Sequence, residues 1–220
     1  MRAAVVLTVL ALTGSAAAGP TGRVVGKVTV TEADGKLAPG ADIVVYVVGF
    51  AEPPTSQGAQ IEQKGRKFVP DLVAITVGES VTFPNGDPFL HNVFSQSATR
   101  KFDLGSFKLH DAKTKDFPSP GVVDVYCNIH PEMAATILVL PNRRHVRANK
   151  DGSYVLDGVP AGDWTVFAYT RRAARPVSAK VSVKPGVETQ LDLAMQRGVE
   201  PEHLNKYGEK YRPGTPSLYR

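Results

Sequence analysis

Short apolar runs, separated by glycine and proline, make up most of this 220-residue chain. Residues 24–31 alternate between apolar and polar positions, as a strand with one buried face does. Residues 43–48 are almost continuously apolar, so a strand there needs cover on both of its faces. No apolar repeat with the 3.6-residue period of a helix persists over three turns. The pattern therefore predicts an all-β protein, with 20 glycines and 17 prolines punctuating the strands.

Further strands follow from the same two patterns along the rest of the chain. Their ranges are 68–77, 80–83, 89–95, 122–127, 136–140, 164–169, 177–183 and 189–193. Two stretches interrupt them, because residues 51–65 predict a linker and the polar residues 99–120 predict an irregular loop. A chain of this length forms one large or two small β domains.

One loop between two predicted strands carries three side chains that suit a copper ion. Cys127, His130 and Met133 offer a thiol, an imidazole and a thioether, and Cys127 is the only cysteine, so it cannot form an intramolecular disulfide. His91, the odd member of an apolar strand, is the obvious fourth donor. The four predict two nitrogens and a sulfur in a trigonal plane, with Met133 as a weak axial ligand. Pro131 disfavours the α conformation for His130 and keeps the loop extended.

These residues also carry a family resemblance. His91-Asn92, followed by Cys127-x2-His130-x2-Met133 between two strands, resembles the cupredoxins, and the short ligand loop is most similar to that of the amicyanins. The resemblance covers residues 60–141 and implies a Greek-key β-sandwich that holds one copper ion in a type 1, or blue, site. In that family the residue after the first histidine donates a hydrogen bond toward the thiolate, a role that falls to Asn92 here.

Two other interpretations of the site stay open. Cys127 can be a small buried hydrophobe beside an ordinary loop residue, His130, because buried free cysteines are common. Glu132 can replace Met133 as a hard oxygen ligand, which gives a copper site that is not blue. His110 has no second donor of metal-ligand type nearby, and we expect it to be exposed to solvent.

A second resemblance concerns the last third of the chain. Residues 151–166, Asp-Gly-Ser-Tyr-Val-Leu-Asp-Gly-Val-Pro-Ala-Gly-Asp-Trp-Thr-Val, resemble the carboxypeptidase regulatory-like domain, a small transthyretin-like β-sandwich. The beginning of that domain is missing there, but residues 22–55 look like it. The prediction is a cupredoxin domain, residues 60–141, inserted between residues 22–55 and 145–195 of the sandwich. The alternative is a separate N-terminal hairpin that flanks the cupredoxin.

The two ends of the chain predict no folded domain. Arg2, the apolar residues 3–12 and Ala16-Ala17-Ala18 predict a signal peptide over residues 1–18, and so a periplasmic or secreted protein. No later apolar run reaches the length of a membrane span. Residues 196–220 predict a flexible basic tail or a strap along the sandwich; the alternative is a docking peptide for a redox partner.

The predicted function is that of an exported blue copper protein, an electron carrier in a periplasmic redox chain with a transient protein partner. His130 is expected to be the partly exposed ligand through which the electron leaves, within an apolar patch of Phe89, Leu90 and Pro131. No nucleophile and base pair predicts an enzyme, and no basic aromatic motif predicts binding of nucleic acid, although the formal net charge is +5. The alternatives are copper storage, delivery or sensing, and a structural or ligand-binding sandwich with a vestigial metal site.

Overall fold

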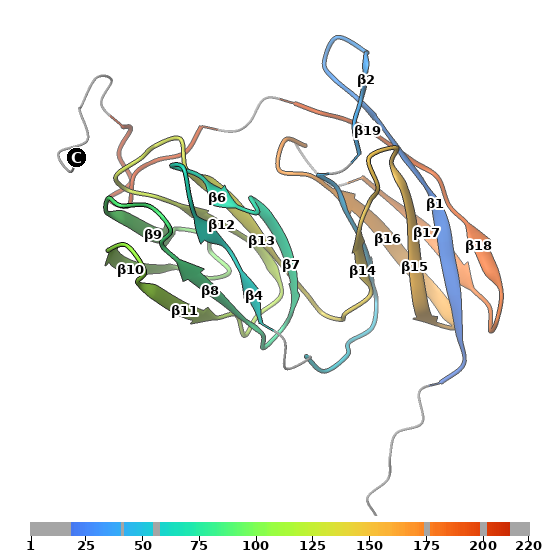
Figure 1. Ribbon diagram of the computed structural model, residues 1–220. Helices are drawn as coiled ribbons and strands as arrows, with labels where there is room; N and C mark the ends of the chain where they lie inside the picture. The colour runs from blue at the N-terminus through green and yellow to red at the C-terminus, as the bar shows by residue number, and fades with distance from the viewer. Residues whose placement is uncertain (1–18, 41, 55–57, 174–176, 199–201, 212–220) are drawn as a thin grey trace, which may run out of the picture.

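The computed structural model describes residues 19–40, 42–54, 58–173, 177–198 and 202–211, and every regular element in these ranges is a β-strand. The all-β prediction is therefore confirmed. The predicted signal peptide and the last part of the predicted tail, residues 212–220, lie outside the described residues. The described part of the chain contains no helix with the length and apolar character that crossing a membrane requires. Two lobes lie side by side (Figure 1).

The central lobe, residues 58–140, contains two main sheets and a short hairpin. The five-stranded sheet has the order β10 (Phe102–Phe107), β9 (His91–Ser95), β12 (Gly121–Tyr126), β13 (Ala134–Leu140), β7 (Leu72–Thr76). The three-stranded sheet has the order β11 (Ala112–Asp116), β8 (Ser80–Pro84), β4 (Ala59–Gln60). The hairpin pairs β5 (Glu62–Gln63) with β6 (Phe68–Val69). All pairs in the five-stranded sheet are antiparallel except β13 with β7.

The terminal lobe combines strands from both ends of the chain. One sheet has β1 (Thr21–Thr31) between β15 (Ser153–Pro160) and β18 (Glu188–Gln190), and β1 also pairs with β19 (Leu193–Gln196) and β2 (Leu37–Ala38). The other has the order β14 (His145–Arg147), β3 (Val44–Val48), β16 (Gly162–Tyr169), β17 (Val177–Val183). Thus β1 and β3 lie in different sheets and pair with strands of the last third of the chain. The insertion hypothesis requires this pairing, and its boundaries stay a prediction.

Alternation along β12 delivers the cysteine to the core of the central lobe. Val123, Val125 and Cys127 are all fully buried in one hydrophobic cluster, whereas Asp124 and Tyr126 take the opposite face and are partly buried. The antiparallel register of β12 with β13 places Val123 opposite Ile137, and Ile137 belongs to the same cluster. The strand therefore fixes the position of Cys127 through packing before any metal is considered.

A separate apolar cluster joins the two lobes. It consists of Val44, Tyr46, Leu72, Leu138 and Leu140, with partly buried Val48, Ala74, Phe167 and Tyr169 around it. Tyr46 stacks on Phe167 with ring centroids 5.4 Å apart. The even-numbered residues of β3 thus face the central lobe while Val45 and Val47 face the core of the terminal lobe. This two-sided cover is what the continuously apolar run over residues 43–48 predicts.

Two sequence predictions of irregular structure are wrong in part. The polar stretch 99–120 contains β10 and β11, and the predicted linker 51–65 contains β4 and β5. Each of β10, β11 and β4 lies at the edge of its sheet. The side chains of β11 are exposed at every second residue, so the strand lacks the apolar signal on which the prediction relied.

Candidate metal centre

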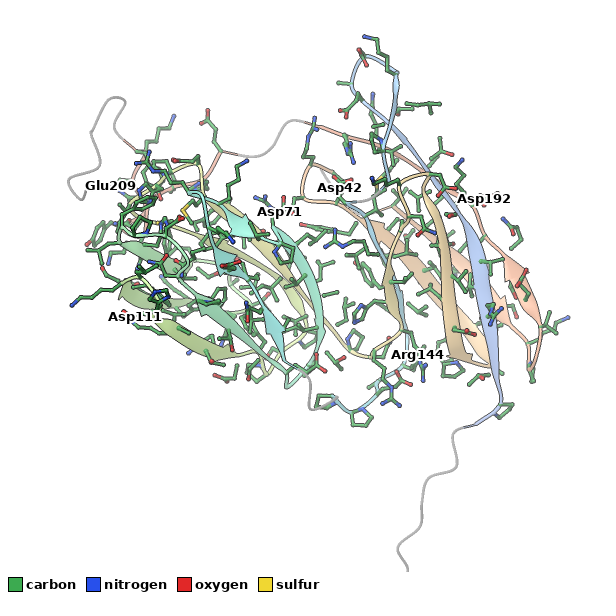
Figure 2. All side chains as sticks on the ribbon, in the orientation of Figure 1. Asp42, Asp71, Asp111, Arg144, Asp192 and Glu209 are labelled. Carbon is green, nitrogen blue, oxygen red and sulfur yellow. The ribbon has the colours of Figure 1, made fainter. Side chains whose placement is uncertain are left out.

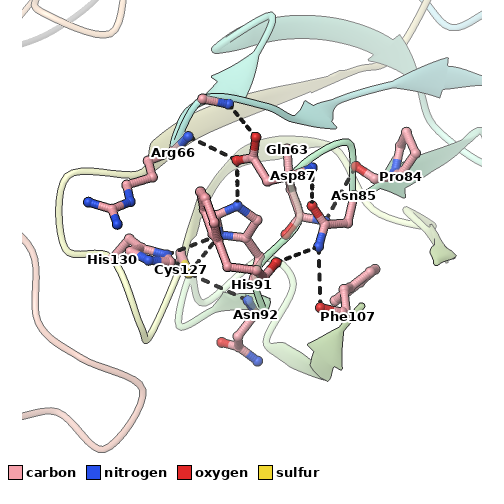
Figure 3. Close-up of polar contacts among 12 residues, drawn as sticks. Gln63, Arg66, Pro84, Asn85, Asp87, His91, Asn92, Phe107, Cys127 and His130 are labelled. Carbon is pink, nitrogen blue, oxygen red and sulfur yellow. Dashed lines mark hydrogen bonds and ion pairs between the residues drawn. The ribbon is translucent and has the colours of Figure 1, made fainter. Parts of the chain in front are cut away.

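Three separate pieces of the central lobe bring the predicted donors together. His91 is the first residue of β9, Cys127 follows β12, and His130 lies in the loop that leads to β13. One ring nitrogen of each histidine and the Cys127 sulfur all lie within 4.8 Å of one another, and all three residues are buried (Figure 3). The sequence separation of 36 residues between His91 and Cys127 is closed by the pairing of β9 with β12.

The distances between the three donor atoms fit a single metal ion. The Nδ1 atoms of His91 and His130 are 3.0 Å apart, and the Cys127 Sγ lies 4.0 Å from the first and 3.8 Å from the second. Bonds of about 2.0 Å to nitrogen and about 2.3 Å to sulfur, the lengths found in zinc sites, allow donors on one ion to be about 4.0 to 4.3 Å apart at most. All three separations lie within these limits, so the donor set fits a transition metal.

The ligand loop, residues 127–133, is closed by its own backbone. The Cys127 N–H donates to the Met133 carbonyl at 3.2 Å, and the Met133 N–H donates to the His130 carbonyl at 3.0 Å. Met133 is fully buried in the same core cluster as Cys127, whereas Glu132 beside it is exposed. The burial pattern therefore favours the thioether over the carboxylate as the fourth donor.

Asn92 ties the strand histidine to the cysteine through its backbone. Its N–H donates to the Cys127 Sγ at 3.4 Å. Its side-chain amide donates to Asp103 Oδ1 at 2.8 Å and to the Gly105 carbonyl at 3.0 Å, which fixes this part of β9 against β10. A hydrogen bond to the sulfur stabilises its negative charge, so Asn92 holds the position that the family resemblance implies.

Asp87 is a residue of the site that the sequence did not single out. Its Oδ2 lies 2.8 Å from His91 Nε2, and the backbone N–H groups of Gly65 and Arg66 donate to its two oxygens at 2.8 and 3.0 Å. Figure 3 shows the carboxylate between these groups. Because a carboxylate accepts, the hydrogen of His91 sits on Nε2, and the Nδ1 lone pair points to the other donors. Asp87 was recognised only as part of a turn, four residues before His91.

Hydrogen bonds keep the Asp87 carboxylate ionised. Burial acts to raise the pKa of Asp87, but the donors Arg66 N–H, His91 and Gly65 N–H together outweigh it. The pKa of Asp87 therefore lies below its ordinary value. A charged carboxylate on the far nitrogen makes the imidazole of His91 a better donor to a metal ion.

The prediction that His130 is partly exposed is wrong. Its side chain is 3% exposed, and Phe89 lies edge-on to the ring with centroids 5.6 Å apart. Phe89 itself and Leu90 are partly buried, and Pro131 is exposed. Within the described residues the Nε2 atom of His130 has no hydrogen-bond partner. The loop spacing gave no sign of this, because the covering ring comes from a different turn.

Burial also sets the protonation of the two loop donors. It lowers the pKa of His130, helped by the nearby His91, so the imidazole is neutral and has a lone pair to share. Burial raises the pKa of the Cys127 thiol, although the N–H groups of Asn92, His130 and Ile129 act against it. A bound cation reverses this preference, because a coordinating thiol loses its proton.

Burial and contacts distinguish between the alternative roles predicted for Cys127 and His110. Cys127 is buried, as the simple hydrophobe hypothesis expects, but two imidazole nitrogens lie at 4.0 Å or less from its sulfur. Buried polar rings are costly in an apolar core unless they are satisfied, so their convergence on the sulfur indicates a ligand. His110 is exposed, as expected, and it belongs to no group of three donors in the described residues.

Several solved structures are similar to part of the chain. A purple cupredoxin from Nitrosopumilus maritimus is 27% identical, over 37% of this chain and 98% of its own, with a TM-score of 0.34. Amicyanin from Paracoccus versutus is 23% identical, over 43% of this chain and 96% of its own, with a TM-score of 0.34. The copper-containing nitrite reductase (NirK) from Thermus scotoductus is 24% identical, over 43% of this chain and 25% of its own, with a TM-score of 0.37.

No protein-family model and no curated protein matches the chain. Because the three TM-scores lie below 0.5, these likenesses carry no weight for function.

Proposed function

We propose that the chain is an exported type 1 copper protein that carries electrons between other proteins. The observation that carries the proposal is the convergence of His91, Cys127 and His130, whose donor atoms lie within 4.8 Å of one another in the buried end of a β-sandwich. Two imidazoles and one thiolate favour copper over the hard ions magnesium and calcium, and a buried Met133 nearby suits the weak axial position. Copper bound there supplies a one-electron couple between Cu(I) and Cu(II).

The residues of the chain supply rigidity and exclude water. The donors sit on β9 and on a short loop whose backbone closes on itself, and Asp87 fixes the orientation of the His91 ring. Phe89 covers His130, so the centre is shielded from solvent. Fixed donors change little when an electron arrives or leaves, and an electron carrier needs that property.

The same features support a carrier over an enzyme or a delivery protein. An enzyme needs an open position for its substrate, whereas this centre has four candidate donors and each of them is buried. Delivery of copper to another protein requires that a ligand exchange at the surface, and His130 at 3% exposure is poorly placed for that. Electron transfer is therefore the proposed function, ahead of copper storage or delivery and of a vestigial metal site.

Export and docking complete the proposal. The proposed location outside the cytoplasm is supported by the composition of residues 1–18. The lone cysteine is compatible with that location, because as a metal ligand it needs no disulfide partner. The partner is a redox protein that binds briefly. We propose that it docks on the exposed Pro131 and on the partly buried Phe89 and Leu90.

The visible and EPR spectra of the copper-loaded protein test this function. A thiolate bound to Cu(II) in a trigonal site gives an intense visible charge-transfer band, so the protein is expected to be blue, and Cys127→Ser is expected to be colourless. His110→Ala, which removes an exposed imidazole outside the site, is the control and should keep the band. A wild-type Cu(II) complex without colour would exclude the type 1 centre.

A further inference from the structure

The C-terminal segment, residues 202–211, returns to the central lobe after β19 has paired with β1 in the terminal lobe. In Figure 1 the chain leaves the terminal lobe after β19, and the segment is seen again beside the end of the central lobe that carries the ligand loop. Figure 2 places Asp192, just before β19, on the terminal lobe and Glu209 on the central lobe. The segment contains no strand, so its position depends on side chains and single hydrogen bonds.

Three of these hydrogen bonds end on the ligand loop itself. The Tyr211 hydroxyl donates to the Cys127 carbonyl at 3.0 Å, and the His203 Nε2–H donates to the Pro131 carbonyl at 2.7 Å. The Lys206 N–H donates to Asn128 Oδ1 at 3.1 Å. The first carbonyl belongs to Cys127, a proposed metal ligand, and the second to Pro131, which follows the proposed ligand His130. The segment thus holds the loop from its outer side.

Ring packing adds to these bonds. The His203 ring stacks on Tyr126, the residue before Cys127, with centroids 3.9 Å apart and planes 17° from parallel. Tyr211 meets the His203 ring edge-on, with the two ring centroids 5.3 Å apart. The two tail rings therefore fix the strand end and the loop together.

The segment also reaches the strand that carries His91. Lys206 Nζ lies 2.8 Å from Asp103 Oδ2, and the other oxygen of Asp103 accepts from the Asn92 side chain at 2.8 Å. Gln96 donates to the Lys206 carbonyl at 2.7 Å. The Asn92 N–H in turn donates to the Cys127 sulfur. Lys206 is therefore linked to the proposed ligand Cys127 through Asp103 and Asn92.

We propose that His203, Lys206 and Tyr211 are positioning residues of the metal centre, through which the C-terminal segment holds the ligand loop in its coordinating shape. The role as a metal centre rests on the proposed function, whereas the clamp on the loop does not. The segment acts through backbone carbonyls, Asn128 and Asp103, and its His203 is not part of the group of His91, Cys127 and His130 that could hold the ion. A clamped loop keeps Cys127 and His130 in place when the metal is absent and slows their departure when it is bound.

Amide hydrogen exchange of the apo-protein over residues 127–133 tests the clamp without a metal. Tyr211→Phe removes only the hydroxyl, and loss of one hydrogen bond should speed exchange in the loop about fivefold. His203→Ala, which also removes the stack on Tyr126, should speed it more. The matched control is Tyr207→Phe, because this tyrosine of the same segment is 72% exposed, and it should exchange as the wild type does.

Release of Cu(I) to bathocuproine disulfonate is the second measurement. The chelator reports by the colour of its own complex, so the rate does not depend on whether the protein is blue. Tyr211→Phe and His203→Ala should release copper faster while the midpoint of thermal unfolding of the apo-protein stays within the range of surface substitutions. Wild-type exchange and release rates in both variants would overturn the proposal, as would an equal acceleration in Tyr207→Phe. A colourless Cu(II) protein, together with faster amide exchange in Tyr211→Phe and His203→Ala, would contradict the proposed function but support the clamp on the loop.

Discussion

Both lobes are built mainly from two β-sheets, and they differ most in the polar residues that they bury. The core of the terminal lobe is an apolar cluster that contains many valines and also Tyr154, Leu156, Leu193 and Met195. Its buried polar residues, Asn142, Thr170 and Arg197, bond to backbone carbonyls or to acidic side chains. The central lobe has an apolar core too, but at one end it buries polar residues: Gln63, Asn85, Asp87, His91, Asn92 and His130. A buried polar group costs free energy unless it is satisfied, so such a concentration marks a site rather than a device for folding.

The comparison also separates what packing determines from what chemistry requires. In the apolar core of the terminal lobe, exchanges between apolar residues of similar volume should be tolerated best, because packing there depends mainly on volume. At the end of the central lobe specific hydrogen bonds orient two of the donors: His91 donates to Asp87, and the Cys127 sulfur accepts from the Asn92 N–H. The lobes should therefore respond to substitution in different ways.

Removal of the central lobe is the most severe test of the comparison. Deleting residues 60–141 and joining the ends with a short Gly/Ser linker should leave a folded terminal lobe, because β1 and β3 pair with strands outside the deleted range. The product should unfold cooperatively and show a β-sheet circular dichroism spectrum. It should also aggregate more readily, since Tyr46 and Phe167 lose the cover of Leu72 and Leu138. An unfolded product would contradict the insertion hypothesis and the proposed boundaries.

Creating a cavity in the core of the terminal lobe tests whether the two lobes are independent. Leu156 is 2% exposed, and Leu156→Ala should lower the free energy of unfolding by about 2 to 5 kcal/mol through lost burial and a residual cavity. Val155→Ala on the opposite face, 48% exposed in the wild type, should change it by no more than about 0.5 kcal/mol. Denaturant unfolding measures both. The visible spectrum of either copper-loaded variant should stay that of the wild type, and a shifted band in Leu156→Ala would mean that the lobes are not independent.

Sequence and structure agree where a pattern depends on neighbours along the chain. Alternation predicts that Val123, Val125 and Cys127 share one buried face, and the structure has all three buried in one cluster. Exposure of His130 could not be predicted this way, because Phe89 covers it from a turn 41 positions earlier in the sequence. Asp87 was missed for a related reason. Its role depends on the hairpin of β5 and β6, which presents Gly65 and Arg66 to the carboxylate, and no local pattern records that approach.

Asp87→Asn probes the hydrogen bond behind His91, with an effect smaller than that of a lost ligand. The Asp87 carboxylate accepts hydrogen bonds from His91, Gly65 and Arg66 at once. The asparagine side chain has only one acceptor oxygen, so at least one of these donors would face its NH2 group and lose its hydrogen bond. Copper affinity should fall about 10- to 100-fold, as is common when the partner of a ligand histidine is changed. Competition with a chelator of known affinity measures the loss.

The control for this variant is Asp116→Asn. Asp116 is an exposed carboxylate on β11 that pairs with Arg100 on the surface, so its replacement should leave copper affinity unchanged. Equal affinity in Asp87→Asn and in the wild type would show that the carboxylate has no part in holding the ring.

The smallest expected effect is the loss at low pH of the contribution that Asp87 makes to the free energy of unfolding of the central lobe. The pKa of Asp87 is lower in the folded protein than in the unfolded chain, so its contribution to stability is complete above the unfolded value of about 3.9. As the pH falls below this value and through the lower folded pKa, the unfolded chain takes up the proton first and the contribution is lost. The difference in unfolding free energy between the apo wild type and Asp87→Asn should therefore be constant from neutral pH to about pH 5 and shrink below about pH 4. Denaturant titrations at each pH measure it, and because both proteins share every other carboxylate, a difference that stays constant into acid would mean that Asp87 is not held as an ion by its three donors.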